Sequence, residues 1–322
     1  MAIFEPTEEN IFKAAEYIQN GELVSFATET VYGLGANALD AAACEKIFIA
    51  KERPHYDPLI VHLADADQVS AVVSDFPSKA QAAAKAFWPG SLTMVLPKKD
   101  NISDSITANM PTVAVRVPKH PVAKALLEKS KLPIAAPSAN PFGYLSPTTA
   151  MHVEEQLGNK IPMILDGGEC ACGIESTIID FTVEPPQLLR LGGISKEQIE
   201  EVCGPIDLGK PVLERPLAPG QLASHYSPNT KLEILPAGEL PSIANGLKAG
   251  LLTTGKCPES GFKMVESVTL TNDLEEAAHN LFSALHRLDG AKLDVIYAHS
   301  FTEQGIGKAI MDRLRKAAAK LK

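Results

Sequence analysis

The chain has 322 residues, of which 45% are hydrophobic and 21% are charged, and its formal net charge at pH 7 is −9. This length is about twice that of a typical domain, so we expect two folding units, and the composition excludes an intrinsically disordered chain. No apolar run approaches the ~18 residues of a membrane span, and no basic and apolar leader follows Met1, so the sequence predicts a cytoplasmic protein that is neither inserted in a membrane nor exported.

The charge is unevenly distributed along the chain. Residues 231–322 hold 12 Lys or Arg and 11 Asp or Glu, which leaves 18 basic and 28 acidic side chains for residues 1–230. Neutralisation of phosphates drives the general binding of nucleic acids, so an acidic first part argues against that class of function.

The five cysteines are scattered and odd in number, which favours a reducing cytoplasm over a disulfide framework. Cys170 and Cys172 are separated by one residue, whereas paired zinc ligands usually have two to four residues between them. We therefore expect an ordinary loop there and assign no metal to protein ligands.

The first two hundred residues alternate between helix and strand patterns. Thr7 can cap a helix whose first turn carries Glu8 and Glu9, and Gly21 is placed to end it. Further helices are predicted at 40–51, 77–87, 121–129, 148–157 and 195–203, and strands at 22–27, 59–63, 92–96, 113–117, 134–136, 163–165, 177–180 and 188–190. Many strands with interleaved helices predict an α/β fold whose sheet is mixed in strand direction.

The pattern changes after residue 204. Residues 205–230 contain five prolines and little periodicity, which predicts an extended connector. Beyond it, strands are predicted at 232–235, 251–253 and 295–298, and helices near 239–249, 274–289 and 306–320, the helix from Leu274 carrying an apolar stripe. We therefore divide the chain into a first domain (1–204), a linker (205–230) and a small α/β domain (231–322).

Several segments of the first domain place polar groups beside strand ends. Residues 28–35 follow a strand and combine hydroxyls with glycines, which lets backbone N–H groups approach an anion, although the segment is neither a dinucleotide fingerprint nor a P-loop. Lys51 and Arg53 close the next helix, either as charges that complement its dipole or as a pair that reaches a polyphosphate. His62 ends a strand, where a histidine is more often part of the core.

Arg116 lies in an apolar strand, so its guanidinium must find an anion, either a protein carboxylate or a ligand. Ser138, Asn140 and Ser176 likewise flank strands, and Arg190 ends one. Each has a plain structural explanation, but open α/β sheets bind ligands at strand ends, so the shared position indicates a binding site.

Taken together, these segments resemble the YrdC-like family in order and spacing. The resemblance rests on residues 28–35, Lys51 with Arg53, 58–62, 112–116, 136–140, 175–178 and Arg190. Residues 219–220 and 224–228 are similar to the linker of the two-domain members, and residues 305–314 to the signature of their C-terminal domain. The match spans nearly the whole chain.

The resemblance implies a twisted mixed sheet with a concave ligand cavity, followed by a small Rossmann-like domain. It implies an L-threonylcarbamoyladenylate synthase, a nucleotidyltransferase that makes threonylcarbamoyl-AMP and pyrophosphate from L-threonine, bicarbonate and ATP. Mg²⁺ would arrive with ATP. A downstream transferase complex would use the adenylate to modify an adenosine in tRNA, and a weak contact with tRNA is expected at most.

The resemblance also assigns residues. The threonine-binding positions correspond to Thr30, His62, Arg116, Ala136 and Ser176, with Arg116 as the partner of the substrate carboxylate. The ATP-binding positions correspond to Arg53, Asp57, Thr112, Ser138, Ser146 and Arg190, with Asn140 and Lys51 in the same cluster and Tyr226 and His225 supplied by a linker that can fold over the cavity. Lys51 and Arg53 would stabilise charge, and no covalent nucleophile is needed.

One departure bears on the site. Asp57 stands where the family frequently has asparagine, and a carboxylate near phosphate would repel it unless it faces Mg²⁺ or a hydrogen-bond donor. This leaves the expected contact of Asp57 with ATP open.

Two other functions stay open on the sequence. One is a carbamoyltransferase that forms carbamoyl-adenylate, although 322 residues leave no room for the zinc-binding and transferase modules that accompany such domains. The other is an RNA-binding module of the same fold, against which the acidic first part argues. The basic residues after 312 (Arg313, Arg315, Lys316, Lys320 and Lys322) are expected to form a solvated helix face.

Overall fold

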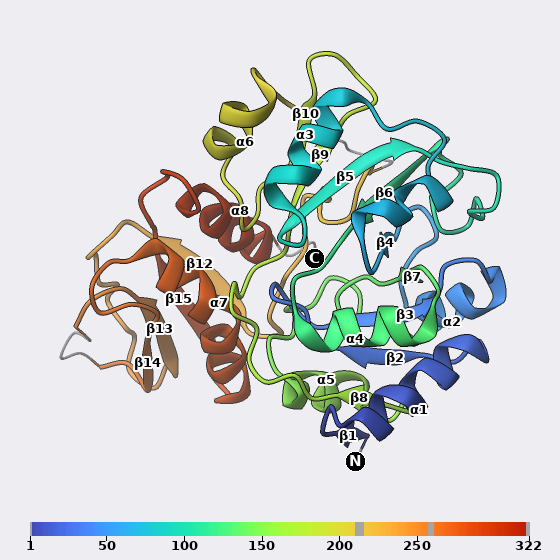
Figure 1. Ribbon diagram of the computed structural model, residues 1–322. Coiled ribbons are helices and arrows are strands. Elements are labelled where there is room, and N and C mark those ends of the chain that lie inside the picture. Colours follow the sequence, from blue (N-terminus) through green and yellow to red (C-terminus); the bar gives the residue numbers. More distant parts are fainter. Residues whose placement is uncertain (1, 210–215, 257–260, 320–322) are drawn as a thin grey trace.

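The structure is a computed structural model that describes residues 2–209, 216–256 and 261–319 (Figure 1). It contains two sheets. The large sheet has eleven strands in the order β1-β8-β2-β3-β7-β4-β6-β5-β9-β10-β11, and the small one has four in the order β12-β15-β13-β14. The large sheet mixes parallel pairs such as β4 with β6 and antiparallel pairs such as β5 with β6, so the mixed α/β architecture that we expected is confirmed.

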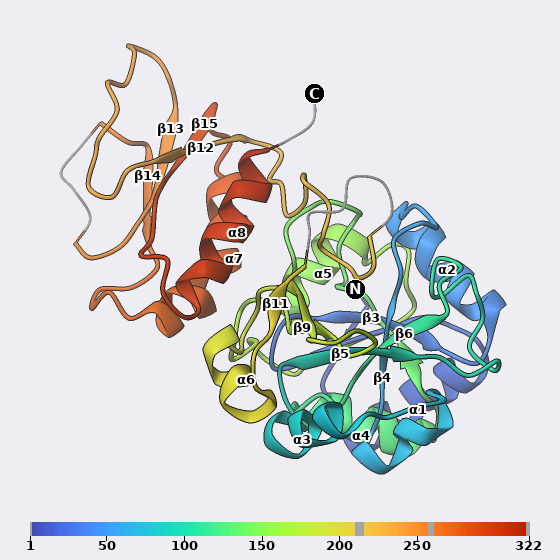
Figure 2. The same ribbon diagram turned by 90° about the horizontal axis from the view of Figure 1, so that it is seen from above.

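The strands of the large sheet are short. They are β1 (Ile3–Phe4), β2 (Val24–Phe26), β3 (Gly33–Asn37), β4 (Ile60–His62), β5 (Leu92–Pro97), β6 (Thr112–Arg116), β7 (Ile134–Ala135), β8 (Ile164–Leu165), β9 (Thr177–Asp180), β10 (Gln187–Arg190) and β11 (Asp207–Leu208). Most of their residues are buried, because helices cover both faces of the sheet. Helices α1, α3 and α4 lie on one face and α2 and α5 on the other (Figure 2).

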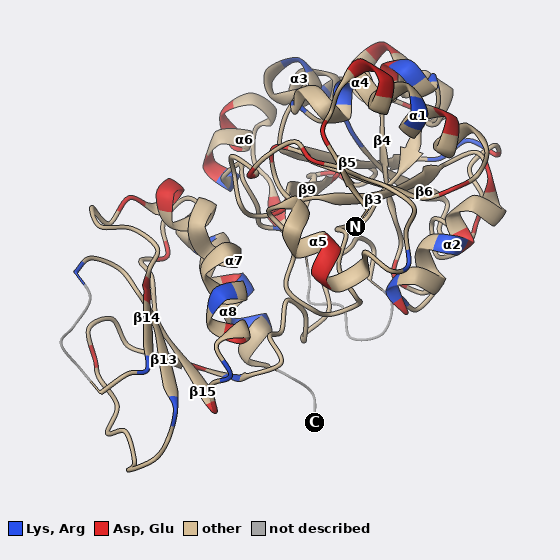
Figure 3. Cartoon of the chain, turned by 90° about the horizontal axis from the view of Figure 1, so that it is seen from below, with Lys and Arg blue, Asp and Glu red and all other residues tan. Residues whose placement is uncertain are grey.

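The helices of this part of the chain, except α3, begin after a residue whose side chain caps them. They are α1 (Glu8–Gln19), α2 (Ala41–Lys51), α3 (Ser78–Phe87), α4 (Pro121–Ser130), α5 (Ala150–Leu157) and α6 (Lys196–Cys203), with a 3₁₀ helix η1 at Ala66–Ala71. Thr7 accepts from the backbone N–H of Asn10, and Ser195 forms a capping box with Gln198. Such caps each contribute about 1 kcal/mol. Charged side chains gather on these helices, whereas the strands carry few (Figure 3).

The small sheet is wholly parallel. It consists of β12 (Lys231–Leu235), β13 (Ala249–Thr253), β14 (Met264–Ser267) and β15 (Val295–His299), accompanied by α7 (Leu274–Gly290) and α8 (Gly307–Ala318). Helices α7 and α8 lie between the small sheet and the rest of the molecule in both Figure 1 and Figure 2. Leu281, Phe282 and Leu285 of α7 are buried, as the apolar stripe predicted.

The interface between the two sheets has a continuous hydrophobic core. Val31, Leu145 and Ile174, which precede or follow strands of the large sheet, pack in one cluster with Tyr226 and the buried residues of α7 and α8. The two parts of the molecule are therefore joined by buried apolar surface as well as by the connector. The limits of the predicted domains, at 204 and 230, stay a prediction.

The structure corrects one predicted helix and adds strands. Residues 239–249 form no helix: the backbone there is irregular, with Pro241 and a Gly246 of φ +86°, and Ala249 already belongs to β13. Strands β1, β3, β11 and β14 were not predicted. Each is short or unusually rich in glycine, so little in its local sequence indicates a strand.

In the described ranges, no helix has both the length and the apolar composition that a bilayer span requires.

Candidate active site

A cavity lies where strand ends of the large sheet meet the connector. We call residues 219–227 the strap, because Pro219, Gly220, His225 and Tyr226 form one wall of this cavity. The cavity is also lined by Thr28, Thr30, Val31, Tyr32, Gly33, Arg53, Ile60, His62, Arg116, Ala136, Pro137, Ser138, Glu175, Ser176 and Arg190. The cavity volume is about 40 Å³, which is room for water but far too small for a nucleotide.

The strap is tightly fitted. Tyr226 is 1% exposed and has a left-handed backbone with φ +60°, and its hydroxyl finds no hydrogen-bond partner in the described part of the chain. Gly220 also has a positive φ, and a Cβ there would lie 2.6 Å from the Tyr226 hydroxyl. Only glycine fits this position. Non-glycine residues with positive φ are costly and cluster at functional sites.

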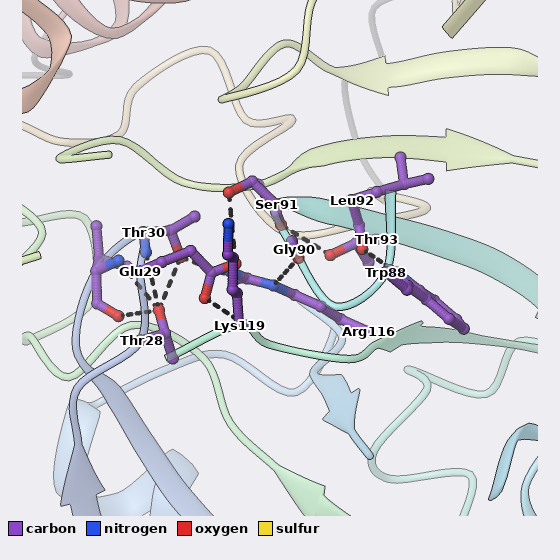
Figure 4. A network of polar contacts seen from close by, with 12 residues as sticks. Thr28, Glu29, Thr30, Trp88, Gly90, Ser91, Leu92, Thr93, Arg116 and Lys119 are labelled. Carbon is purple, nitrogen blue, oxygen red and sulfur yellow. Dashed lines mark hydrogen bonds and ion pairs between the residues drawn. The ribbon is translucent and has the colours of Figure 1, made fainter. Parts of the chain in front are cut away.

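Arg116, at the end of β6, is held by a network that Figure 4 shows. Its Nη2 donates to Glu29 Oε1 at 2.6 Å, its Nη1 to Thr30 Oγ1 at 2.9 Å and its Nε to the carbonyl of Gly90 at 3.1 Å. Burial alone would raise the pKa of Glu29, but the adjacent guanidinium holds it below its usual value. The anion that the buried Arg116 required is therefore, in part, a protein carboxylate that the sequence did not indicate.

The turn before β3 is fixed by hydroxyls. Thr28 Oγ1 accepts from the backbone N–H groups of Thr30 and Val31 and lies 2.8 Å from Thr30 Oγ1. This local turn, typical of Ser and Thr, presents the Thr30 hydroxyl to Arg116. The polar turn that the sequence indicated at 28–35 is thus part of the cavity wall.

His62, at the end of β4, lies in the cavity wall rather than only in the core. It is 3% exposed, and its Nδ1 has no hydrogen-bond partner among the described residues. Burial and the neighbouring Arg116 lower its pKa to about 3. The imidazole is therefore neutral at physiological pH, and its Nδ1 can form one hydrogen bond with a ligand.

Lys51 does not line the cavity. It is 1% exposed at the end of α2, and its Nζ donates to the carbonyl oxygens of Ser138, at 2.6 Å, and of Asn140. Burial lowers its pKa well below the usual value. Lys51 thus holds the loop that carries Ser138 from behind, and Asn140 contributes to that loop by donating to the carbonyls of Pro141 and Tyr144.

Arg53 lines the cavity and pairs with Asp57. Its Nη2 lies 2.9 Å from Asp57 Oδ2, and it donates to the carbonyls of Asp57 and Pro58. Asp57 is fully buried, and its Oδ1 has no hydrogen-bond partner among the described residues. Burial raises the pKa of Asp57 although Arg53 opposes this. The Asp57 carboxylate is therefore held as half of an ion pair with Arg53, although neither of its oxygens makes a hydrogen bond within the described residues.

Arg190, at the end of β10, differs from Arg53 and Arg116 because it forms no ion pair with a carboxylate of the described residues. Its Nε and Nη2 donate to the carbonyl and the hydroxyl of Ser176, both at 3.0 Å, and its Nη1 to the carbonyl of Pro219 at 3.3 Å. Within residues 2–209, 216–256 and 261–319, no carboxylate lies within 4.0 Å of it, and burial lowers its pKa. A buried guanidinium without a counter-charge is a suitable partner for a phosphate.

A third ion pair comes from the small-sheet part of the chain. Arg313 of α8 donates to Glu175 Oε2 at 2.8 Å, and the other Glu175 oxygen accepts from the hydroxyl of Ser146. The solvated face predicted for these basic residues is wrong for Arg313, which is 0% exposed, and for Lys316, whose side chain is 17% exposed, and it holds for Arg315. Lys320 and Lys322 lie outside the described residues.

The predicted site residues therefore fall into three groups. Ten line the cavity: Thr30, Arg53, His62, Arg116, Ala136, Ser138, Ser176, Arg190, His225 and Tyr226. Four contact the lining residues from behind: Lys51, Asp57, Asn140 and Ser146. Thr112, at the start of β6 and paired with Pro97 of β5, belongs to neither group. Sequence reasoning missed Glu29, Glu175 and Arg313, because their partners are distant in the sequence.

Two histidines stack across the interface near this site. The rings of His152 in α5 and His286 in α7 lie 4.0 Å apart, and His286 Nε2 lies 3.1 Å from the carbonyl of Ser146. Burial, together with His286 and Arg287, lowers the pKa of His152 to about 3. Burial also lowers the pKa of His286 to about 4, although the hydrogen bond to Ser146 and the charge of Asp289 oppose this. Both are neutral at pH 7.

This pair should make the protein less stable in acid. Between pH ~6.5 and ~4 the unfolded chain binds protons that the folded chain does not, so the free energy of unfolding falls as the pH falls. We expect the loss of Tm between pH 7 and pH 4 to be smaller by about 3 °C in His152→Phe, which keeps the ring stack. His55→Phe, at an exposed position, is the control, and equal losses in the two variants would contradict the explanation.

Comparison with known proteins gives consistent matches over nearly the whole chain. Residues 16–192 match the Sua5, YciO and YrdC family profile, described as "Telomere recombination", and residues 194–319 match the profile "Threonylcarbamoyl-AMP synthase, C-terminal domain". The threonylcarbamoyl-AMP synthases of Pyrococcus abyssi and Bacillus subtilis are 44% and 45% identical to this chain, covering 95% and 96% of it and 93% and 92% of their own lengths. The crystal structure of P. abyssi Sua5 complexed with L-threonine superposes with a TM-score of 0.92 at 42% identity, covering 99% of this chain and 98% of that one.

Proposed function

Because this chain belongs to the Sua5–YciO–YrdC family, we propose that it is a threonylcarbamoyl-AMP synthase that uses L-threonine, bicarbonate and ATP. The observation that carries the proposal is the composition of the cavity. It brings together Arg116 with the Thr30 hydroxyl and the neutral His62. It also contains Arg190, which has no carboxylate within 4.0 Å among the described residues. The first set suits an amino acid, and the second suits a phosphate.

On the threonine side, Arg116 is the proposed partner of the substrate carboxylate. A guanidinium has five N–H groups, and the protein uses three of those of Arg116, so one N–H on each Nη remains for a two-point contact. Thr30 and the neutral His62 flank it, and Ala136 and Ser176 complete this side of the cavity.

On the ATP side, the proposed contacts come from the loop after β7, from Arg190 and from the strap. Ser138, Arg53, Arg190 and Tyr226 line the cavity directly. Ser146, Asn140, Asp57 and Lys51 support these residues from behind, and we propose that they shape the nucleotide site. The assignment of Thr112 to ATP stays a prediction. Because the cavity is too small for a nucleotide with the strap in place, we propose that the strap moves aside when ATP enters and closes over the bound nucleotide.

The chemistry proposed for the cavity needs no covalent protein nucleophile. The threonine amine combines with bicarbonate to give a carbamate and water. A carbamate oxygen then attacks the α-phosphorus of ATP, the bond to the bridging oxygen breaks, and pyrophosphate leaves, which makes the enzyme a nucleotidyltransferase. Burial raises the pKa of the nearby Cys172 thiol, so it stays protonated. Positioning and charge stabilisation by the arginines would supply the catalysis.

We propose that Mg²⁺ enters with ATP, where it would neutralise phosphate charge. Across the described parts of the chain, no three or more His, Cys, Asp or Glu side chains form a group that could hold a metal. We propose that the phosphates of ATP would be the chief ligands of the ion. Asp57, with its unpartnered Oδ1, is the carboxylate that would face it.

We also propose that the adenylate passes to a separate transferase complex that modifies tRNA, and that the protein is cytoplasmic. The net charge of residues 1–230 argues against a strong contact with tRNA itself.

The test is pyrophosphate release from ATP, Mg²⁺ and bicarbonate, measured with L-threonine, with L-serine and with neither. We expect release that depends on threonine and yields threonylcarbamoyl-AMP by mass spectrometry. Release that depends instead on carbamoyl phosphate would indicate the carbamoyl-adenylate chemistry. No release from a folded protein that binds RNA would indicate the binding module.

A further inference from the structure

Helix α8 brings a buried charge from the small-sheet part of the chain to the candidate active site. Arg313 is among the largest fully buried side chains, and its guanidinium makes several contacts outside its own helix. It donates to Glu175 Oε2 at 2.8 Å and to the carbonyl of Leu191 at 2.8 Å, and its Cζ lies 5.0 Å from the centre of the Tyr226 ring. Within its own helix it also donates to Asp312 at 2.7 Å. Arg313 thus contacts the cavity wall and the strap at once.

The same helix holds the strap at a second point. Lys316 Nζ donates to the carbonyl of Gly220 at 2.7 Å, and the Lys316 carbonyl accepts from the backbone N–H of His225 at 3.3 Å. Residues three apart lie on the same face of a helix, so Arg313 and Lys316 form one edge against the strap. The position of the strap over the cavity therefore depends on α8.

The charges around the cavity explain what Arg313 does there. Glu29 pairs with Arg116 and Asp57 pairs with Arg53, and Glu175 pairs with Arg313. Burial would raise the pKa of Glu175, but Arg313 and, more weakly, Arg190 lower it, so the carboxylate is ionised. Arg190 has no carboxylate within 4.0 Å among the described residues.

If Arg313 were absent, the buried Glu175 carboxylate would have Arg190 as its nearest remaining cationic partner. A buried carboxylate without a partner is strongly unfavourable, so Arg190 would be drawn to Glu175 and away from a phosphate. The hydrogen bond from Ser146 to Glu175 would shift as well. Arg313 therefore keeps both groups in place for the nucleotide.

We propose that Arg313 is a positioning residue for ATP: it neutralises Glu175 so that Arg190 stays free for phosphate, and it holds Tyr226 of the strap over the nucleotide. The inference rests on the proposed function. It gives the small-sheet part of the chain a direct role in nucleotide binding, with no contact of its own to the reacting atoms.

The test compares the full-length chain with Arg313→Met, Arg313→Lys and the double variant Glu175→Gln/Arg313→Met. Arg315→Met, on the same helix but in an exposed pair with Glu303, is the matched control. The readouts are kcat, the KM values for ATP and threonine, ATP affinity by calorimetry, and hydrogen exchange of the strap amides. Melting curves and circular dichroism show whether each variant folds.

For Arg313→Met we expect a rise of about tenfold or more in the KM for ATP, a KM for threonine within about twofold, and faster exchange at the His225 amide. Arg313→Lys, which keeps the charge, should recover part of the affinity. The double variant should bind ATP more tightly than Arg313→Met alone, because the uncompensated charge is gone. Arg315→Met should behave like the parent chain.

A merely structural role for Arg313 would lower the melting temperature without a selective change in the KM for ATP. The inference is overturned if Arg313→Met keeps the parent KM for ATP, or if the double variant is no better than the single one. If Arg313→Met does not fold, the same decision rests on Arg313→Lys and on the double variant. A parent chain that binds ATP but releases no pyrophosphate with threonine would instead contradict the proposed function.

Discussion

Arg116→Ala is expected to raise the KM for L-threonine by about 100-fold. The substitution removes the two remaining N–H groups proposed for the substrate carboxylate. It also leaves Glu29, now without its cation, as a buried negative charge where the carboxylate must bind. Loss of a charged, hydrogen-bonded partner in a buried site costs about 2–5 kcal/mol, or about 30-fold to a few thousand-fold, and a factor of about 100 lies within this range. Pyrophosphate release at varied threonine concentration measures it.

Arg116→Lys separates geometry from charge. A lysine keeps the positive charge beside Glu29 but cannot present two parallel N–H groups, so we expect a threonine KM between those of the parent and of Arg116→Ala. ATP affinity without threonine should change by no more than a few-fold in either variant, because Arg190 and Arg53 are untouched. Equal threonine KM values in the parent chain and Arg116→Ala would show that the carboxylate binds elsewhere.

Arg190→Met is expected to weaken ATP binding by at least tenfold. Arg190 is the cavity arginine that has no carboxylate within 4.0 Å in the described chain, and its proposed partner is a phosphate. Removal of one charge-assisted contact to a polyphosphate corresponds to a loss of tenfold to a hundredfold in affinity, and release of the strap through Pro219 adds to it. Calorimetric titration with ATP and Mg²⁺ measures the change.

The stability of the ligand-free protein gives an independent check on the same residue. Removal of an uncompensated buried charge should change the free energy of unfolding little, by about 1 kcal/mol in either direction. Arg53→Met is the comparison, since it leaves Asp57 buried without a partner and should destabilise the protein by about 3–5 kcal/mol. A large destabilisation in Arg190→Met would show that Arg190 mainly stabilises the fold. Unchanged ATP affinity in this variant would show that the phosphates bind elsewhere.

Much of the fold followed from local signals in the sequence. The caps at Thr7 and Ser195 lie where helices α1 and α6 begin, and the apolar stripe of α7 faces the core. These features depend on residues within one or two turns of each other. The helix predicted at 239–249 is the exception, because Pro241 and Gly246 lie within it and the backbone there is irregular.

The candidate site was predictable as a set of residues but not as a set of contacts. The motifs placed ten residues in one cavity, whereas the partners of the arginines had no local signal. Glu29 lies 87 residues from Arg116 and Glu175 lies 138 residues from Arg313, and each carboxylate is separated from its arginine by several secondary-structure elements. Only the folded arrangement shows which of the four buried arginines is left without a carboxylate.

The distance in sequence between Glu175 and Arg313 also has a consequence for biosynthesis. A ribosome adding about 5–20 residues per second needs on the order of ten seconds to pass from one to the other. During that interval the last strands of the large sheet, β9 to β11, are made, yet α8, which fastens the strap and neutralises Glu175, has not been made. On the role that we propose for Arg313, a nascent chain therefore carries an unfinished nucleotide site, and we expect full ATP affinity only after the second part of the molecule has docked.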